Sequence, residues 1–256
     1  MKKIFLFSLI IATVFASSTA FAKVAKGYYY QIKIYHFRTK AQEAQLDSYL
    51  QNAYLPAMHR AGIKSVGVFK PIVQDTTDQL IYVFTPFLKF DQFLTLDEKL
   101  KNDSQYLTAS KDYNEAAYNA SPYSRIESIL LKAFSGMPAP AVPKLSSAKN
   151  ERVYELRSYE GATEALSLNK INMFNVDELS IFTNLNFNPV FYGQVISGSK
   201  MPNLMYMTTF NNKADRDKHW ADFTPEYRKI SGKPEYARNT SKNTMYFLYP
   251  ADYSDY

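Results

Sequence analysis

Two short stretches of the chain carry polar side chains at matching positions. Residues 30–35 read YQIKIY and residues 154–159 read YELRSY, so polar and apolar side chains alternate in both. Alternation with a period of two, rich in Tyr and Ile, predicts β-strands. Residues i and i+2 of a strand share a face, so one face gathers an amide, three charged groups and two tyrosine hydroxyls. These residues are Gln31, Lys33, Tyr35, Glu155, Arg157 and Tyr159.

This polar face is a candidate ligand site, because a carboxylate, a guanidinium and tyrosine hydroxyls suit a small polar or aromatic ligand. The opposite face holds residues 30, 32, 34, 154, 156 and 158, which are more apolar. We expect that apolar face to lie under helices and the polar face to point into the space between two sheets. A buried charge needs a partner, so Glu155 and Arg157 should pair with each other or with Lys33. A purely structural ion-pair network is the alternative.

The three histidines do not form a metal site by spacing. His36, His59 and His219 stand far apart, without the H-x-x-x-H pattern of many zinc sites, so no metal is predicted. His36 ends the first predicted strand and is the best single candidate for acid–base catalysis or for an axial haem ligand; a structural histidine is the alternative. Glycine-rich nucleotide motifs and the G-x-S-x-G motif are absent, and no cofactor is predicted.

The N-terminus predicts export. Two lysines at positions 2 and 3 precede an apolar run over residues 4–15, and residues 20–22 read AFA. This order is typical of a secretory signal peptide that ends at Ala22. The run is too short to cross a bilayer, which takes about 20 residues. We therefore expect a mature chain in the periplasm or outside the cell that is not held in a membrane.

Composition narrows the classes of partner. The chain has no cysteine, which excludes disulfides and thiolate metal sites. Its 30 basic and 24 acidic residues are interspersed, as in residues 213–218, which read KADRDK. A nucleic-acid-binding protein would gather its basic residues on one face, so nucleic acid is not an expected partner.

The chain repeats itself at an offset of 124 residues. Residues 30–35 match 154–159, residues 63–66 match 187–190, and residues 80–83 match 204–207, in the same order. In the first copy we expect strands at 28–37, 66–71, 80–85 and 126–134, with helices at 40–61, near 90–94 and at 104–118. In the second we expect strands at 152–159, 189–197, 203–210 and 244–249, with helices at 163–185 and 212–230.

These elements predict an α+β protein built from two tandem ferredoxin-like (βαββαβ) units. The first unit covers residues 23–134 and the second covers residues 151–256. Residues 135–150 contain three prolines and no aromatic residue, which is typical of a linker. Each sheet has a second face that helices do not cover, so we expect the two sheets to pack face to face as a pseudo-dimer.

Several stretches resemble the NIPSNAP family. In the second copy they are residues 153–159 (VYELRSY), 188–193 (NPVFYG), 201–206 (MPNLMY) and 215–220 (DRDKHW); in the first, residues 59–71 and 125–138 resemble the N-terminal half of exported bacterial members. The resemblance implies a dimeric α/β-barrel type of fold and no settled activity.

Two functions follow as hypotheses. The first is an exported protein that binds a small molecule or a protein partner through the inter-sheet space or a dimer surface; a homodimer stays open. The second, by analogy of fold, is a cofactor-independent oxygenase or isomerase. A cavity that reaches His36 or Arg157 would favour the enzyme, and a seam filled by side chains would favour the first hypothesis.

Overall fold

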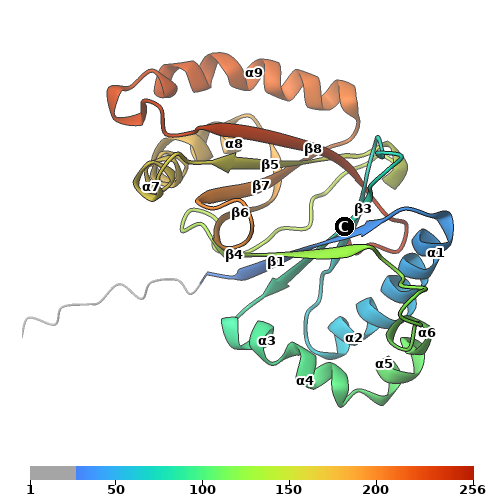
Figure 1. The fold of residues 1–256 in the computed structure, drawn as a ribbon. Coiled ribbons are helices and arrows are strands. Elements are labelled where there is room, and N and C mark those ends of the chain that lie inside the picture. The colour runs from blue at the N-terminus through green and yellow to red at the C-terminus, as the bar shows by residue number, and fades with distance from the viewer. Residues whose placement is uncertain (1–26) are drawn as a thin grey trace, which may run out of the picture.

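The protein is described by a computed structural model that covers residues 27–256, and the predicted signal peptide over residues 1–22 lies outside the described residues. The described residues form eight strands and two groups of helices (Figure 1). The strands are β1 (Tyr29–Phe37), β2 (Gly67–Pro71), β3 (Gln79–Phe87), β4 (Arg125–Ala133), β5 (Val153–Glu160), β6 (Asn188–Ser197), β7 (Asn203–Phe210) and β8 (Lys242–Pro250).

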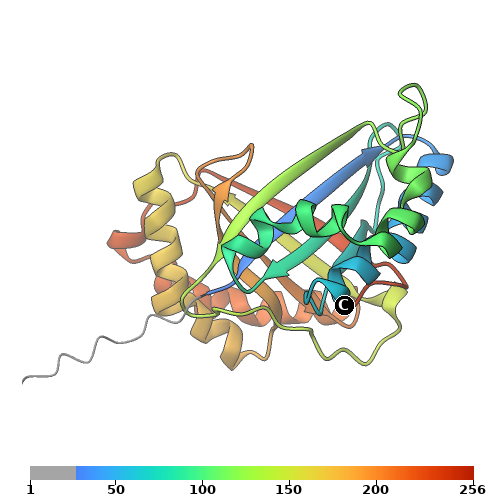
Figure 2. The same cartoon turned by 90° about the horizontal axis from the view of Figure 1, so that it is seen from below.

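Helices follow the strands in two groups. The first group is α1 (Lys40–Tyr49), α2 (Leu55–Arg60), α3 (Phe90–Leu94), α4 (Leu96–Lys101), α5 (Ser104–Ala109) and α6 (Lys111–Asn114). The second group is α7 (Glu164–Met173), α8 (Leu179–Asn184) and α9 (Lys213–Ser231). The two groups lie on opposite sides of the strands, and Figure 2 shows the barrel from the side that the first group covers.

The strands form one closed antiparallel barrel in the order β1-β3-β2-β8-β5-β7-β6-β4. Within residues 29–133 the order is β4-β1-β3-β2, and within residues 153–250 it is β8-β5-β7-β6, so both halves have the same order. Two seams, β2–β8 and β4–β6, join the halves. The β2–β8 seam is short, because only Phe69, Lys70 and Pro71 of β2 pair with β8.

The barrel interior is filled by large apolar side chains, which corrects one expectation. Residues 30, 32 and 34 of β1 and residues 154 and 156 of β5 point into the barrel and not toward the helices. The interior of an eight-stranded barrel is narrow enough for side chains to fill it, and here apolar side chains fill it, so the inner face is the more apolar one. The other members of this core include Phe69, Phe84, Phe191, Met205, Met207, Leu248 and Tyr256.

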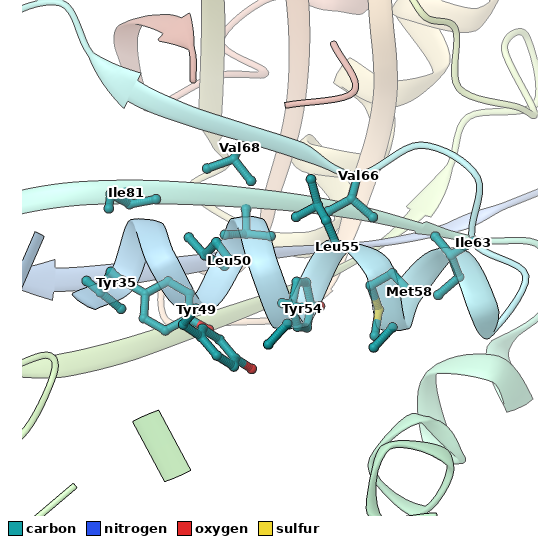
Figure 3. Close-up of a cluster of buried hydrophobic side chains, with 14 of the residues drawn as sticks. Tyr35, Tyr49, Leu50, Tyr54, Leu55, Met58, Ile63, Val66, Val68 and Ile81 are labelled. Carbon is teal, nitrogen blue, oxygen red and sulfur yellow. The ribbon is translucent and has the colours of Figure 1, made fainter. Parts of the chain in front are cut away.

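A second apolar layer lies between the strands and the first helix group. Tyr49, Leu50, Tyr54 and Met58 pack from the helices onto residues such as Val68 of β2 (Figure 3). The helix predicted over residues 40–61 is divided by a π-helical turn at Leu50–Tyr54, just before Pro56. Proline cannot donate to the residue four positions earlier, and the wider turn accommodates it.

A matching π-helical turn lies 124 residues later, at Phe174–Glu178 between α7 and α8. The segment 135–150 has no strand and only the start of a short 3₁₀ turn at Lys149–Glu151. It packs on the barrel: Ala141 donates its backbone N–H to the carbonyl of Val190 at 2.9 Å. Within residues 27–256, no helix combines the length and the apolar character that crossing a membrane requires.

Candidate functional site

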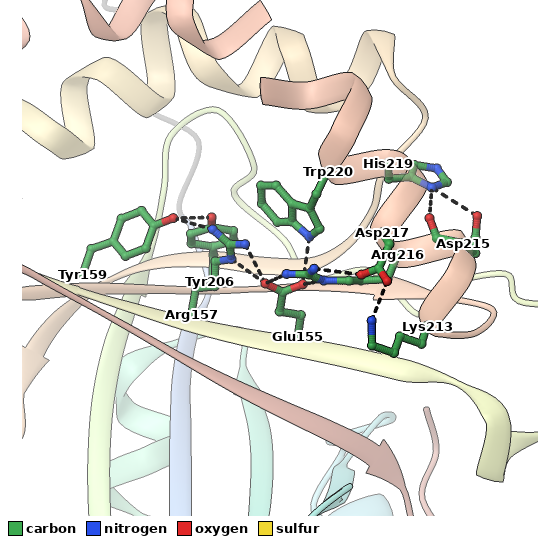
Figure 4. Close-up of polar contacts among 10 residues, drawn as sticks. All are labelled: Glu155, Arg157, Tyr159, Tyr206, Lys213, Asp215, Arg216, Asp217, His219 and Trp220. Atoms are coloured by element: carbon green, nitrogen blue, oxygen red, sulfur yellow. Dashed lines mark hydrogen bonds and ion pairs between the residues drawn. The ribbon is translucent and has the colours of Figure 1, made fainter. Parts of the chain in front are cut away.

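The polar face of β5 carries a buried, connected set of charges (Figure 4). Arg157 donates from Nε to Glu155 Oε1 at 2.7 Å. Arg216 donates from Nε to Glu155 Oε2 at 2.8 Å, and Trp220 donates its indole N–H to the same oxygen at 2.8 Å. The Arg157 guanidinium also lies 3.6 Å from the centre of the Trp220 ring. Both oxygens of the carboxylate are therefore occupied by neighbours from β5 and α9.

The chain of contacts continues along the strand. Arg157 Nη1 donates to the Tyr159 hydroxyl at 3.0 Å, and the hydroxyls of Tyr159 and Tyr206 are 2.8 Å apart. Burial alone would raise the pKa of the Glu155 carboxyl, but Arg216 and Arg157 outweigh burial and hold that pKa below its usual range. Glu155 is thus a carboxylate that its two arginines keep ionised.

This set lies under the helices, so the expectation that the polar face points between the sheets was wrong. The helix layers cover the polar faces of both strands. These faces carry Gln31, Lys33 and Tyr35 on β1 and Glu155, Arg157 and Tyr159 on β5. The reason is that α9 brings Arg216 and Trp220 to this face, while the inner face must be apolar to fill the barrel.

The predicted residues of β1 do not join those of β5. Gln31 donates its side-chain amide to Ser128 Oγ at 2.8 Å. The Lys33 ammonium lies 5.2 Å from the ring centre of Tyr54, and Tyr35 belongs to the apolar layer of the first helices. Glu155 and Arg157 pair with each other, as expected, and neither pairs with Lys33. A role of these six residues in ligand binding stays a prediction.

A second buried ion pair was not foreseen. The Lys170 ammonium on α7 lies 2.7 Å from Glu178 Oε2, and both side chains are 2% exposed. Lys170 also donates to the Tyr227 hydroxyl at 3.1 Å. Burial alone would lower the pKa of the Lys170 ammonium, but Glu178 and Tyr227 raise it. The two residues are eight positions apart across a π-helical turn, a spacing that the i, i+4 rule does not detect.

A groove of about 980 Å³ lies outside the barrel interior, at the β2–β8 seam. One wall is the loop from Pro71 to Leu80 between β2 and β3, and the other is β8 from Met245 to Tyr249. Four apolar side chains of these walls are unusually exposed: Ile72 by 49%, Val73 by 85%, Met245 by 44% and Phe247 by 40%. Exposed apolar side chains gathered in a hollow are typical of a binding surface.

Charged residues line the rim of the groove. Asp75 and Asp78 lie on the loop wall, whereas Arg152, Lys213 and Arg216 lie on the side of β5 and α9, together with Glu151 and Asp217. Sequence reasoning missed this groove. The only sequence feature that points to the groove is the apolar pair at positions 72–73 before a polar turn. That pair does not reveal that β8 forms the opposite wall.

His36 stands beside the groove. Its Nδ1 lies 2.9 Å from Asp78 Oδ2, and its Nε2 lies 3.3 Å from Glu127 Oε1. The ring is buried, but it borders an open hollow of about 610 Å³ that Asp78 shares. Because Asp78 also lines the groove, the two hollows adjoin.

The carboxylates contact opposite nitrogens of the His36 ring, so the three groups do not converge on one point. In the described part of the chain, no group of three or more His, Cys, Asp and Glu residues is arranged to hold a metal ion.

Comparisons with known proteins match part of the chain to a family model and most of it to a fold. The NIPSNAP family model matches residues 154–255. No curated protein matches the chain. A structure with a proposed monooxygenase assignment from Lactobacillus acidophilus superposes with a TM-score of 0.58 at 12% identity, over 88% of this chain and 94% of that one.

Two further structures have the same fold. One has a proposed monooxygenase assignment and comes from Fusobacterium nucleatum; its TM-score is 0.57 at 8% identity, over 88% of this chain and 92% of that one. The other is an anthrone oxidase-like protein, with a TM-score of 0.51 at 6% identity and the same two shares. At these identities the likeness concerns the fold alone. The NIPSNAP family model thus matches residues 154–255, which contain the buried Glu155 network and β8. The α/β barrel around them is the fold that these structures share.

Proposed function

We propose that this protein binds an apolar ligand, either a small molecule or a segment of another protein, in the groove at the β2–β8 seam. The observation that carries the proposal is the gathering of Ile72, Val73, Met245 and Phe247, all exposed, on the two facing walls of one groove. The inter-sheet space that the sequence suggested is filled by side chains, so it offers no comparable room.

The groove has the size and character of a binding site. Small-molecule sites of about 300–1,000 Å³ with mainly apolar walls and a few polar groups are typical of proteins. Several charges near the groove are already paired: Asp78 with His36, Lys213 with Asp217, and Arg216 with Glu155. Apolar contact is therefore expected to supply most of the affinity, and the charged rim to orient the ligand.

The wider setting is also part of the proposal. We infer two tandem ferredoxin-like units, because both halves have one strand order and the two π-helical turns are 124 residues apart. We also propose an exported protein, in the periplasm or outside the cell, because residues 1–22 have the sequence pattern of a secretory signal peptide. A homodimer is compatible with the fold, and native mass spectrometry of protein from its own host would report both the oligomer mass and any retained ligand.

The groove is tested by titration with anilinonaphthalene sulfonate, a fluorescent apolar probe. Phe247→Asp and Ile72→Asp place a charge on opposite walls, and each is expected to raise the dissociation constant at least about tenfold, because apolar burial is lost. Leu168→Asp changes a side chain of similar exposure on α7, far from the groove, and should bind the probe as the wild type does. If both wall variants bind like the wild type while thermal unfolding shows them folded, the groove is not the site.

The enzyme hypothesis has one supporting observation, the His36 ring held between Asp78 and Glu127 beside an open hollow. A carboxylate that orients an imidazole is a common element of acid–base catalysis. If the protein turns over a ligand recovered by native mass spectrometry, His36→Asn should lower the rate at least about a hundredfold while probe binding in the groove is retained. An unchanged rate in His36→Asn would exclude His36 as the acid or base.

A further inference from the structure

One edge of β8 is paired for only part of its length. On the side of β2, the pairing covers Leu248 to Pro250, and the last bond of this ladder runs from the Ile72 N–H to the Phe247 carbonyl at 2.9 Å. On its other side β8 pairs with β5 from Lys242 to Leu248. In the described part of the chain, β8 therefore continues for several residues beyond its β2 partner.

The direction of the free backbone groups follows from strand geometry. Backbone hydrogen bonds of successive residues point alternately to the two sides of a strand. Because the Phe247 carbonyl bonds toward β2, the N–H and C=O groups of Met245 and Asn243 point to the same side. Within residues 27–256 no strand pairs with that side of β8 before Phe247, so the backbone groups of Met245 face the groove and those of Asn243 continue the same edge beyond it.

The groove occupies the place that a longer β2 would fill. Phe69 of β2 pairs with Tyr82 of β3 on one side and with Pro250 of β8 on the other, so β2 is one strand between two. After Ile72 the chain turns away. The side-chain amide of Gln74 then occupies the edge of β3, because it exchanges two hydrogen bonds of 2.9 Å with the backbone of Leu80. The edge of β3 is thus covered while that of β8 is not.

We propose that the occupant of the groove is an extended segment of another polypeptide, about five residues long, that adds to the free edge of β8 as a strand. The inference rests on the proposed function and names its ligand class. An extended segment supplies alternating donors and acceptors for Met245 and Asn243, and apolar side chains for the walls. A small apolar molecule would leave these backbone groups without partners.

Charge and space favour a segment over a second copy of this chain. The loop wall at positions 72–78 stands opposite β8, so the groove admits one strand and not a folded barrel. Asp75 lies on the loop wall and Arg152 on the opposite rim beside α9, and among the described residues neither of them forms an ion pair. A segment with a basic residue toward the loop and an acidic residue toward α9 complements this distribution.

The probe is the heptapeptide acetyl-Lys-Val-Thr-Val-Thr-Val-Glu-amide, followed by NMR of the backbone amides. We expect the largest shifts at Met245 and Asn243 and a dissociation constant between about 10 µM and 1 mM. Two controls carry N-methyl groups, one on all valines and one on all threonines. In an extended peptide, the backbone N–H groups of either the valines or the threonines face β8, and those of the other residue type point away from it. Methylation blocks bonding to β8 in only one control, so the two controls should differ in affinity at least about tenfold. Equal affinities would overturn strand addition.

A matched pair of variants tests the protein side. Met245→Pro and Met245→Ala both remove the side chain, but only Met245→Pro removes the free N–H, and proline is tolerated at strand edges. We expect peptide affinity to fall at least about fivefold further in Met245→Pro, with equal binding of anilinonaphthalene sulfonate. Probe binding without any peptide binding would overturn this inference and leave the groove as a small-molecule site. If the Phe247→Asp and Ile72→Asp variants bind both the probe and the peptide as the wild type does, the proposed function itself is overturned.

Discussion

Replacing Glu155 by alanine is expected to lower the free energy of unfolding by about 3–5 kcal/mol. The side chain is fully buried and accepts hydrogen bonds from Arg157, Arg216 and Trp220. Its removal leaves the Arg157 guanidinium, itself 11% exposed, without its carboxylate, and leaves the indole N–H without an acceptor. An uncompensated charge of this kind costs far more than a lost surface pair.

Urea denaturation of the wild type and Glu155→Ala measures this difference, and thermal unfolding should show a fall in Tm of about 6–20 °C. Asp217→Ala is the control: Asp217 contacts the same Arg216 from the surface, so its removal should lower the free energy of unfolding far less than Glu155→Ala does. A loss below about 1 kcal/mol in Glu155→Ala would show that the buried set contributes no more than a surface pair.

The same residue sets the response to acid. The pKa of Glu155 is lower in the folded state than its usual value, so its contribution to stability is complete above the unfolded pKa of about 4.3 and is lost as pH falls through the folded pKa. The difference in unfolding free energy between wild type and Glu155→Ala should therefore be constant above about pH 5 and shrink below about pH 4.

Replacing Lys170 by methionine is expected to cost a similar amount, about 3–5 kcal/mol. The Glu178 carboxyl is then buried without its cation, and burial, the main cause that raises the pKa of Glu178, acts with less opposition. The Tyr227 hydroxyl loses its hydrogen bond as well. The fit of methionine to the apolar part of the lysine side chain limits any cavity.

A double-mutant cycle separates the pair from its surroundings. Lys170→Met with Glu178→Leu removes both charges and is expected to recover to within about 2 kcal/mol of the wild type, because an apolar pair of similar volume needs no compensation. Urea denaturation of the four proteins gives the coupling. Additive losses in the double variant would mean that the two charges do not stabilise each other.

The local alternation and spacing of apolar residues in the sequence were sufficient to predict most of the helices and strands. The alternation in residues 30–35 and 154–159 placed β1 and β5, and the offset of 124 residues recurs in the two π-helical turns. A helix break near Pro56 was also expected from the sequence, because proline lacks a backbone N–H, although the matching turn at Phe174–Glu178 has no proline. The eight-stranded antiparallel barrel agrees with the fold class that the resemblance implied.

The orientation of the strand faces could not be predicted in the same way. A period of two separates the faces of β5 but does not say which one faces inward, and both faces are buried. The decision depends on Arg216 and Trp220, which lie 61 and 65 residues from Glu155 in the chain. Contacts over such separations come from packing and leave no local pattern.

The groove and the neighbours of His36 also depend on contacts between distant parts of the chain, so the local sequence did not predict them. The groove exists because β2 ends before β8 does, and this depends on the register between the two halves. His36 was a candidate by its place in the chain, but Asp78 reaches it from the loop before β3 and Glu127 from β4. Neither pairing is visible in the sequence around position 36.

The central claim is that the β2–β8 groove is where this protein binds. The most direct measurement is a map of backbone amide shifts by NMR during titration with anilinonaphthalene sulfonate. The largest changes should fall on Ile72, Val73, Met245 and Phe247, on both walls at once. Changes centred elsewhere, for example around the small hollow between Phe182 and Tyr192, would contradict it.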